Sequence, residues 1–179
     1  MLPRVPGYGR YAQIEREQRW IMDGLPVKIL DPVEITDRYL AGTRLRLREM
    51  KSAGEIIWKL GQKVREVDDS PEIVRITNIY LDAHEYEALA DLDARVLNKT
   101  RWKWVDARRP SAIDSFHGVL EGLVLAEVEL AIDDEYLAMP EGAIADVTLD
   151  NRFSGGALAS LDQSGAEEFL NHVRNYKHL

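Results

Sequence analysis

In the stretch Gln13-Ile14-Glu15-Arg16-Glu17-Gln18-Arg19-Trp20, the charged residues Glu15, Glu17 and Arg19 share one parity, and Ile14 and Trp20 share the other. Successive side chains of a β-strand point to opposite faces, so this alternation predicts a strand with one charged face. The two glutamates would lie roughly 6.5–7 Å apart on that face, where like charges repel unless opposite charges lie across from them. We therefore expect neighbouring strands to carry cations.

Four more segments of the chain alternate in the same way, each with charges of one sign. A second acidic pair lies at Glu127 and Glu129, and cationic pairs lie at Arg46/Arg48, at Lys59 or Lys63 with Arg65, and at Lys99/Arg101. Exposed ion pairs on the outside of a sheet would account for any one of these pairs. Five such strands together favour a barrel whose charged face lines the inside, with helices covering the outside. A tunnel of this kind would bind a polyanion through its phosphates, and its carboxylates would hold a hard cation such as Mg²⁺.

The rest of the chain predicts an α+β fold. About seven or eight strands with few helices favour a mostly antiparallel sheet or barrel. We expect a short helix or turn at Val33–Leu40, and a helix from the capping-box pair Asp82 and Glu85 to about Val96. Gly155 and Gly156 are expected to open a C-terminal helical region. Residues 1–11, with two prolines and two glycines, predict an extended N-terminal arm, and residues 12–179 predict a single domain.

Composition narrows the classes of function. The 179-residue chain has a net charge of −8 and no cysteine. An acidic chain binds duplex nucleic acid or anionic membrane poorly, and the lack of cysteine excludes disulfides, thiolate metal sites and cysteine nucleophiles. The sequence has no apolar run of membrane-spanning length, no signal-peptide pattern and no P-loop motif, so we expect a cytoplasmic protein that does not use P-loop chemistry.

The charged motifs resemble those of the CYTH domain, a family also called the triphosphate tunnel metalloenzymes. Glu15-Arg16-Glu17-Gln18-Arg19 is similar to the family signature Glu-x-Glu-x-Lys, with an arginine in the place of the lysine. Arg46-Leu47-Arg48, Lys63, Lys99-Thr100-Arg101, the acidic segment that ends at Glu127-Val128-Glu129 and the closing segment 146–153 follow in family order. The resemblance covers about residues 13 to 160.

This resemblance implies an eight-stranded antiparallel β-barrel that forms a tunnel and is flanked by helices. It also implies metal-dependent hydrolysis of a small triphosphate, with inorganic triphosphate as the leading substrate. The alternatives are a thiamine triphosphatase, a class IV adenylyl cyclase, or a non-catalytic module that binds polyphosphate or a nucleotide. A barrel of this kind can also form a homodimer through its outer helices.

The resemblance further implies roles for individual residues. The metal, Mg²⁺ or Mn²⁺, would be bound by Glu15, Glu17, Glu127 and Glu129. The triphosphate would be held by Arg19, Arg46, Arg48, Lys63, Lys99 and Arg101. Catalysis is expected to depend on Glu127, Glu129 and Arg19. By parity, Lys59, Arg65 and Arg75 are additional candidates for the tunnel lining, Asp114 and Asp146 are candidate partners of its cations, and Tyr39 belongs either to the tunnel mouth or to the core.

Arg19 is the one departure from the family pattern. Arginine keeps the positive charge and can bind phosphate through two N–H groups, so a role in anion binding is preserved. Its guanidinium does not deprotonate at working pH, so any role that needs a neutral amine is lost.

Overall fold

The computed structural model describes residues 6–65, 70–105, 109 and 111–176. The strands are β1 (Gln13–Met22), β2 (Ile29–Leu40), β3 (Leu45–Ser52), β4 (Glu55–Val64), β5 (Ile73–Leu81), β6 (Ala94–Trp104), β7 (Ser111–Phe116), β8 (Val124–Leu130) and β9 (Ala143–Asp146). The helices are α1 (Ala83–Ala90), α2 (Gly155–Leu158) and α3 (Gln163–Asn175), with 3-10 turns η1 (Gly118–Leu120) and η2 (Asn151–Phe153). Across the described ranges, no helix combines the length and the apolar character needed to cross a membrane.

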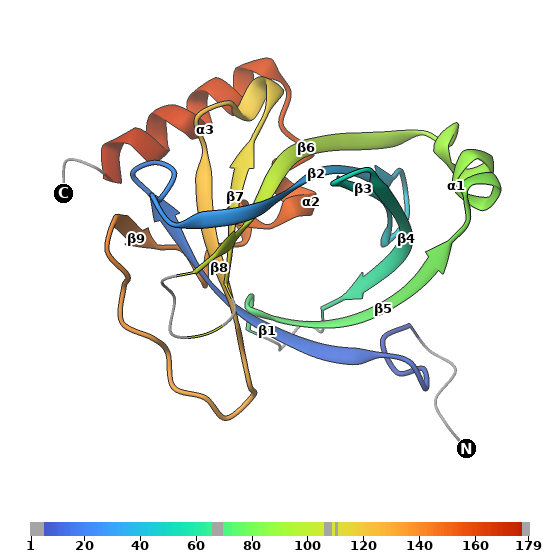
Figure 1. The fold of residues 1–179 in the computed structure, drawn as a ribbon, viewed down its shortest axis with the longest axis horizontal. Coiled ribbons are helices and arrows are strands. Elements are labelled where there is room, and N and C mark those ends of the chain that lie inside the picture. The colour runs from blue at the N-terminus through green and yellow to red at the C-terminus, as the bar shows by residue number, and fades with distance from the viewer. Residues whose placement is uncertain (1–5, 66–69, 106–108, 110, 177–179) are drawn as a thin grey trace.

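Strands β1 to β8 form a closed antiparallel barrel (Figure 1). The strand order is β5-β4-β3-β2-β6-β7-β8-β1, and pairing of β1 with β5 closes the ring. On the edge away from β8, β1 changes neighbour along its length: its first residues, Gln13–Arg16, pair with β5, and its last residues, Trp20–Met22, pair with β9. The predicted eight-stranded antiparallel barrel of an α+β fold is therefore confirmed, and β9 is a short addition beside it.

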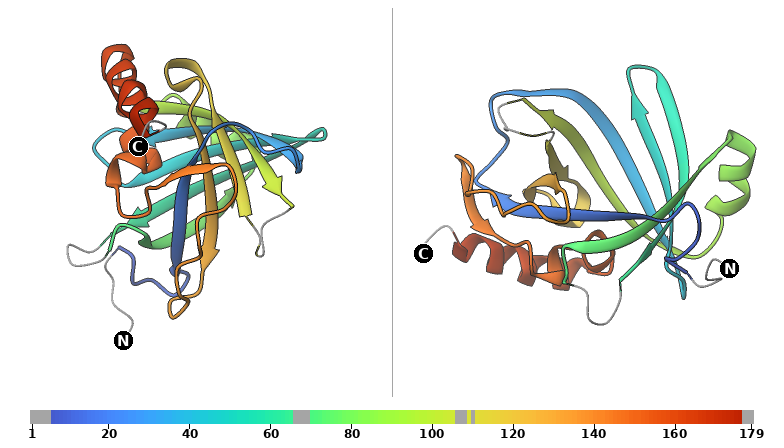
Figure 2. Two further views of the ribbon diagram at one scale, coloured as in Figure 1. Left: turned by 90° about the vertical axis from the view of Figure 1, so that its left-hand side faces the viewer. Right: turned by 90° about the horizontal axis from the view of Figure 1, so that it is seen from below.

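The hydrophobic core has two parts, one at an end of the barrel interior and one on its outer face. In the first, Ile21 and Leu125 share the inward parity of Arg19 and Glu127, and they pack against Phe153 and Phe169 of the C-terminal region. A second cluster surrounds Trp20 on the outer face of β1, β7 and β8. Helix α3 packs on the first cluster, and α1 lies at the opposite side of the molecule (Figures 1 and 2). Burial of apolar surface thus closes one end of the barrel and covers part of its outer wall, and charged side chains line most of the remaining interior.

The outward polar residues of β1 hold the irregular segment between β8 and β9. Arg16 donates hydrogen bonds to the carbonyls of Ala131 and Ile132, at 3.3 and 3.2 Å. The amide of Gln18 donates to the carbonyl of Leu137 at 3.1 Å and accepts from the N–H of Leu137 at 2.8 Å. This segment is thereby fixed over the second apolar cluster, although it contains no helix or strand.

The prediction of a helix or turn at Val33–Leu40 is wrong, because these residues belong to strand β2. The register between β2 and β6 shifts between Leu30 and Val33, and Asp31 has a left-handed backbone with φ of 53°. Pro32 therefore lies at a β-bulge, one of the few places where a strand accommodates proline.

The predicted capping box of α1 is confirmed. The carboxylate of Asp82 accepts from the N–H of Glu85 at 2.8 Å, and the carboxylate of Glu85 accepts from the N–H of Asp82 at 2.9 Å. The predicted end near Val96 is wrong, because the helix ends at Ala90. From Ala94 the chain pairs with β2, and this pairing satisfies the backbone groups in a strand.

Helix α2 begins at Gly155, as expected for a C-terminal helical region that opens there, and packs against Tyr39 of β2. A Cβ atom at Gly155 would lie 2.2 Å from the hydroxyl oxygen of Tyr39. A Cβ atom at Gly156 would meet its nearest neighbour at 3.7 Å, an ordinary contact distance. The first glycine is therefore required by close approach, and the second is not.

We expect Gly155→Ala to lower the free energy of unfolding by about 1–3 kcal/mol, because the added methyl overpacks against Tyr39. Gly156→Ala is the matched control and should leave stability unchanged or raise it slightly, because alanine favours helix. Urea denaturation of the two variants measures the difference. Equal effects at the two positions would contradict this account of the contact.

Candidate functional site

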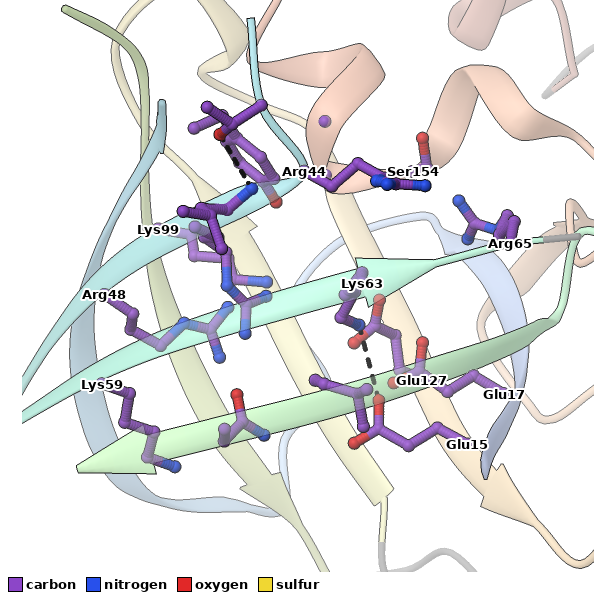
Figure 3. Close-up of a pocket in the computed structure, with 18 of the residues that line it drawn as sticks. Glu15, Glu17, Arg44, Arg48, Lys59, Lys63, Arg65, Lys99, Glu127 and Ser154 are labelled. Atoms are coloured by element: carbon purple, nitrogen blue, oxygen red, sulfur yellow. Dashed lines mark hydrogen bonds and ion pairs between the residues drawn. The ribbon is translucent and has the colours of Figure 1, made fainter. Parts of the chain in front are cut away.

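A cavity of about 320 Å³ occupies the barrel interior (Figure 3). Among the described residues that line it, nine are arginine or lysine and three are glutamate. The cations are Arg19, Arg44, Arg46, Arg48, Lys59, Lys63, Arg65, Lys99 and Arg101, and the carboxylates are Glu15, Glu17 and Glu127. The cations outnumber the carboxylates threefold, so the cavity favours an anion that carries several charges.

The charges of this cavity are separated in space. In Figure 3 the three carboxylates gather on one side, near Lys63, and Arg48, Lys59 and Lys99 lie across from them. The cavity thus has an acidic wall, formed by β1 and β8, and a cationic wall, formed mainly by β3, β4 and β6.

Asp37 holds two of the cations in the cationic wall. This carboxylate is 1% exposed and accepts from Nε and Nη2 of Arg48 at 2.6 and 2.7 Å. Nε of Arg46 lies 3.4 Å from the same carboxylate. Burial alone would raise the pKa of Asp37, but Arg48 and Arg46 hold the pKa well below its usual range. The aspartate therefore stays ionised and orients both guanidiniums.

Asp114 plays the same part for β6. This carboxylate is fully buried, forms an ion pair with Lys99, and accepts from Nε and Nη2 of Arg101 at 2.7 Å each. Burial opposes its charge, and Arg101 and Lys99 together keep its pKa below the ordinary value. Asp114 is thus a partner of the tunnel cations, as the sequence suggested. Asp146, the other candidate, instead accepts from Gln18 at 2.9 Å on the outside of the barrel.

Each of these aspartates is shared by two cations, so each group of three side chains keeps one net positive charge. Buried ion pairs of this kind add little to stability by themselves, because desolvation offsets most of the attraction. Their effect on the site is to fix the orientation of the cations before a ligand arrives.

The acidic wall is organised around Arg19, which is 5% exposed. Its Nη2 forms an ion pair with Glu17, and its Nε donates to Glu127 at 3.0 Å. Glu127 also accepts from Nη2 of Arg101 at 2.5 Å, and Glu15 lies 3.5 Å from Nζ of Lys63. Every carboxylate of this wall therefore has a cationic partner.

The pKa values of the two central glutamates follow from this arrangement. Burial and the proximity of Glu127 raise the pKa of Glu17, but Lys63 and Arg19 outweigh them and bring it below the ordinary value. Burial likewise raises the pKa of Glu127, and Arg101 and Arg19 lower it well below its usual range. Both carboxylates are thus ionised at neutral pH.

Glu129 lies apart from the main cavity. It is exposed and lines a second cavity of about 260 Å³. Glu17, Arg101 and Glu127 line both cavities, so these three side chains form the partition between the two spaces. Glu129 shares the inward parity of Glu127 but sits on the far side of this partition.

Solved structures of similar shape identify the architecture. The crystal structure of the inorganic triphosphatase NE1496 matches with a TM-score of 0.58 and 25% identity, over 83% of this chain and 95% of that one. The chain has the triphosphate tunnel fold of the CYTH family. A crystal structure described as that of the hypothetical protein NE1496 gives a TM-score of 0.56 and 24% identity, over 81% of this chain and 97% of that one. Neither a family model nor a curated protein sequence matches the chain.

The tunnel has donors that suit a hard divalent cation. Glu17 and Glu127 are ionised oxygen donors held close to the same guanidinium, and Mg²⁺ needs only one or two carboxylates when water and phosphate oxygens complete its coordination. Within the described part of the chain, no three acidic or histidine side chains are arranged as a ready-made metal cage. The residues present therefore fit a cation that is shared with a phosphate ligand.

The tunnel brings together most of the residues that the motifs indicated. All six expected phosphate-binding residues line it, as do three of the four expected metal ligands, and the additional candidates Lys59 and Arg65 line it too. Arg75 does not: it points outward, with its guanidinium 4.8 Å from the ring centre of Tyr8. Tyr39 lines the cavity next to Gly155, and burial raises its pKa to about 12, so its hydroxyl remains a hydrogen-bond donor.

The motifs did not indicate Asp37 or several of the lining residues, among them Asn78 and Ser154. Asp37 lies in the segment for which the sequence predicts a helix or turn, so no charged strand face is expected there. The signal that would have found it is the alternation of Val33, Ile35 and Asp37, which share the face of β2 that faces Arg48 across the β2–β3 pair. Ser154 lies in the turn before α2, where periodicity carries no information, and Asn78 lies within β5, on a face that carries no charge to mark it.

We expect Asp37→Asn to lower the free energy of unfolding at pH 7 by about 3 kcal/mol or more, because two buried guanidiniums lose their carboxylate. The pKa of Asp37 is lowered in the folded state, so its stabilisation is complete at higher pH and declines once the unfolded chain takes up the proton, below about pH 4. Chemical denaturation from pH 3 to 8 should show a constant difference between wild type and variant above about pH 5 and a shrinking one below. A difference that does not change with pH would contradict this assignment.

Proposed function

We propose that this protein hydrolyses inorganic triphosphate in its tunnel, with Mg²⁺ or Mn²⁺ as cofactor. The observation that carries the proposal is the separation of charge in the cavity, where oriented cations face two ionised carboxylates. The fold supports it, because a structure of the same fold at 25% identity is that of an inorganic triphosphatase.

In this proposal the cationic wall binds the phosphate chain. Arg46 and Arg48 on β3, with Lys99 and Arg101 on β6, converge on one cavity and are oriented by buried aspartates. Their positions are fixed before the substrate binds, so they stabilise the negative charge that grows on the leaving phosphate without reorganising. Lys59 and Lys63 extend this wall along β4.

The acidic wall positions the attacking water. Glu17 and Glu127 are ionised, so either can accept a hydrogen bond from water and orient it toward the terminal phosphorus. Glu17 and Glu127 would hold a divalent cation, which would lower the negative charge that repels the attacking water.

The cavity lining favours an inorganic substrate over thiamine triphosphate or a nucleotide. Among the described lining residues Tyr39 is the one aromatic side chain, and its hydroxyl lies against Gly155. A thiamine or adenine ring is commonly bound by stacking on an aromatic side chain, and this cavity offers no free aromatic face for it.

The first test is phosphate release from inorganic triphosphate, ATP and thiamine triphosphate, each with Mg²⁺, with Mn²⁺ and with chelator. We expect metal-dependent release that is fastest from inorganic triphosphate. Glu127→Gln should lower turnover by about 100-fold or more, because it removes one ionised carboxylate from the acidic wall. Glu121→Gln is the matched control, since that side chain directly follows η1, is 73% exposed and does not line the cavity.

A second readout separates binding from catalysis. Inorganic triphosphate should raise the melting temperature of the protein, because a ligand that binds only the folded state stabilises it. If the melting temperature rises but no product forms with any metal, the protein binds polyphosphate without hydrolysing it, and the proposed activity is wrong. Full activity of a folded Glu127→Gln variant would overturn the assigned role of the acidic wall.

A further inference from the structure

The side chain at position 19 occupies the place where the acidic wall would bind a cation. One guanidinium contacts both Glu17 and Glu127, through Nη2 and through Nε at 3.0 Å. These are the two carboxylates that line both the main cavity and the second cavity. Arg19 itself lines the main cavity, with its positive charge directed at both carboxylates.

We propose that Arg19 acts as an internal counter-ion that competes with the divalent cation for Glu17 and Glu127, and that a bound phosphate chain releases these carboxylates by taking over the guanidinium. The proposal rests on the proposed function, because it concerns the same tunnel. It predicts that metal and anion bind together, each weakly in the absence of the other.

Geometry explains why arginine suits this role. Nε and Nη2 of a guanidinium are separate donors in one rigid plane, so a single side chain satisfies two carboxylates at once. The ammonium of lysine is one compact charge and would contact a single carboxylate closely. The pKa of Arg19 agrees with this role. Burial opposes its charge, but Glu127 and Glu17 raise the pKa above the ordinary value, so the guanidinium stays protonated.

The other cations around the acidic wall do not share this arrangement. Arg101 contacts Glu127, but its guanidinium is also paired with Asp114, and Lys63 pairs with Glu15. Phosphate oxygens are equally good acceptors for a guanidinium, and Arg19 faces the cavity in which the phosphate chain is expected. Exchange of carboxylate for phosphate would leave the guanidinium bonded, would free Glu17 from Arg19, and would leave Glu127 with Arg101 as its remaining partner.

The test measures Mn²⁺ binding by paramagnetic resonance of the free ion, without any phosphate, on the whole protein. Arg19→Gln should bind Mn²⁺ about tenfold more tightly than wild type, because two charge-assisted contacts no longer compete with the metal. Arg19→Lys keeps the charge but lacks the two separate donors of a guanidinium, and should also bind Mn²⁺ more tightly than wild type. Arg44→Gln is the matched control: it removes one cation from the same cavity, at a point that Figure 3 shows well away from Glu17 and Glu127.

Equal gains in Arg19→Gln and Arg44→Gln, with none in Arg19→Lys, would mean that net charge alone governs affinity and would overturn the proposal. Wild-type affinity in both Arg19 variants would overturn it as well, while leaving the proposed hydrolysis intact. No Mn²⁺ binding by either folded Arg19 variant would also overturn the proposal, while the metal dependence of the proposed hydrolysis is tested separately, with substrate present. Circular dichroism checks the fold of each variant. If Arg19→Gln does not fold, Arg19→Lys alone is compared with wild type.

A second arm tests the release step by calorimetric titration of inorganic triphosphate in chelator. Arg19→Gln should weaken binding about tenfold, because the phosphate chain loses the guanidinium that it would take from the carboxylates. Unchanged affinity would show that the phosphate chain does not engage Arg19, and would overturn the release step.

Discussion

The structure depends on the neutralisation of charge inside a closed barrel. Like charges two residues apart on one strand repel, and the barrel interior offers less water than a surface to screen them. The strand order answers this constraint, since a cationic strand lies next to a strand that supplies a buried carboxylate. Arg48 on β3 faces Asp37 on β2, Arg101 on β6 faces Asp114 on β7, and Arg19 on β1 is paired with Glu127 on β8.

This constraint explains where the apolar core lies. The middle of the barrel interior is committed to charge, so apolar surface is buried at one end of the barrel and on its outer face. The C-terminal helices cover the first cluster at that end, and the segment between β8 and β9 covers the second. Tyr39 packs on the first cluster and also lines the cavity, so packing and chemistry meet at this residue.

Much of this could be predicted from the sequence, because alternation is a local property. The parity of β1, β3, β4, β6 and β8 correctly placed their charged residues inside. Pairing between strands is not local, so the role of Asp37 could not be predicted. The bulge at Asp31 and Pro32 interrupts the alternation of its strand, and its partner Arg48 lies on another strand. Parity also says nothing about depth along the tunnel, which is why Glu129 shares the face of Glu127 but lies in a different cavity.

Strand β1 is committed on both of its faces. Its inward residues line the tunnel. Of its outward residues, Arg16 and Gln18 form hydrogen bonds with the segment between β8 and β9, and Trp20 packs in the second apolar cluster. Its edge away from β8 is divided between the seam with β5 and the pairing with β9. From Glu15 to Trp20 the strand thus has almost no neutral position at which substitutions could accumulate. A shift of one residue along this strand would exchange the lining of the tunnel with its packing, so insertions and deletions can be accommodated only beyond its ends.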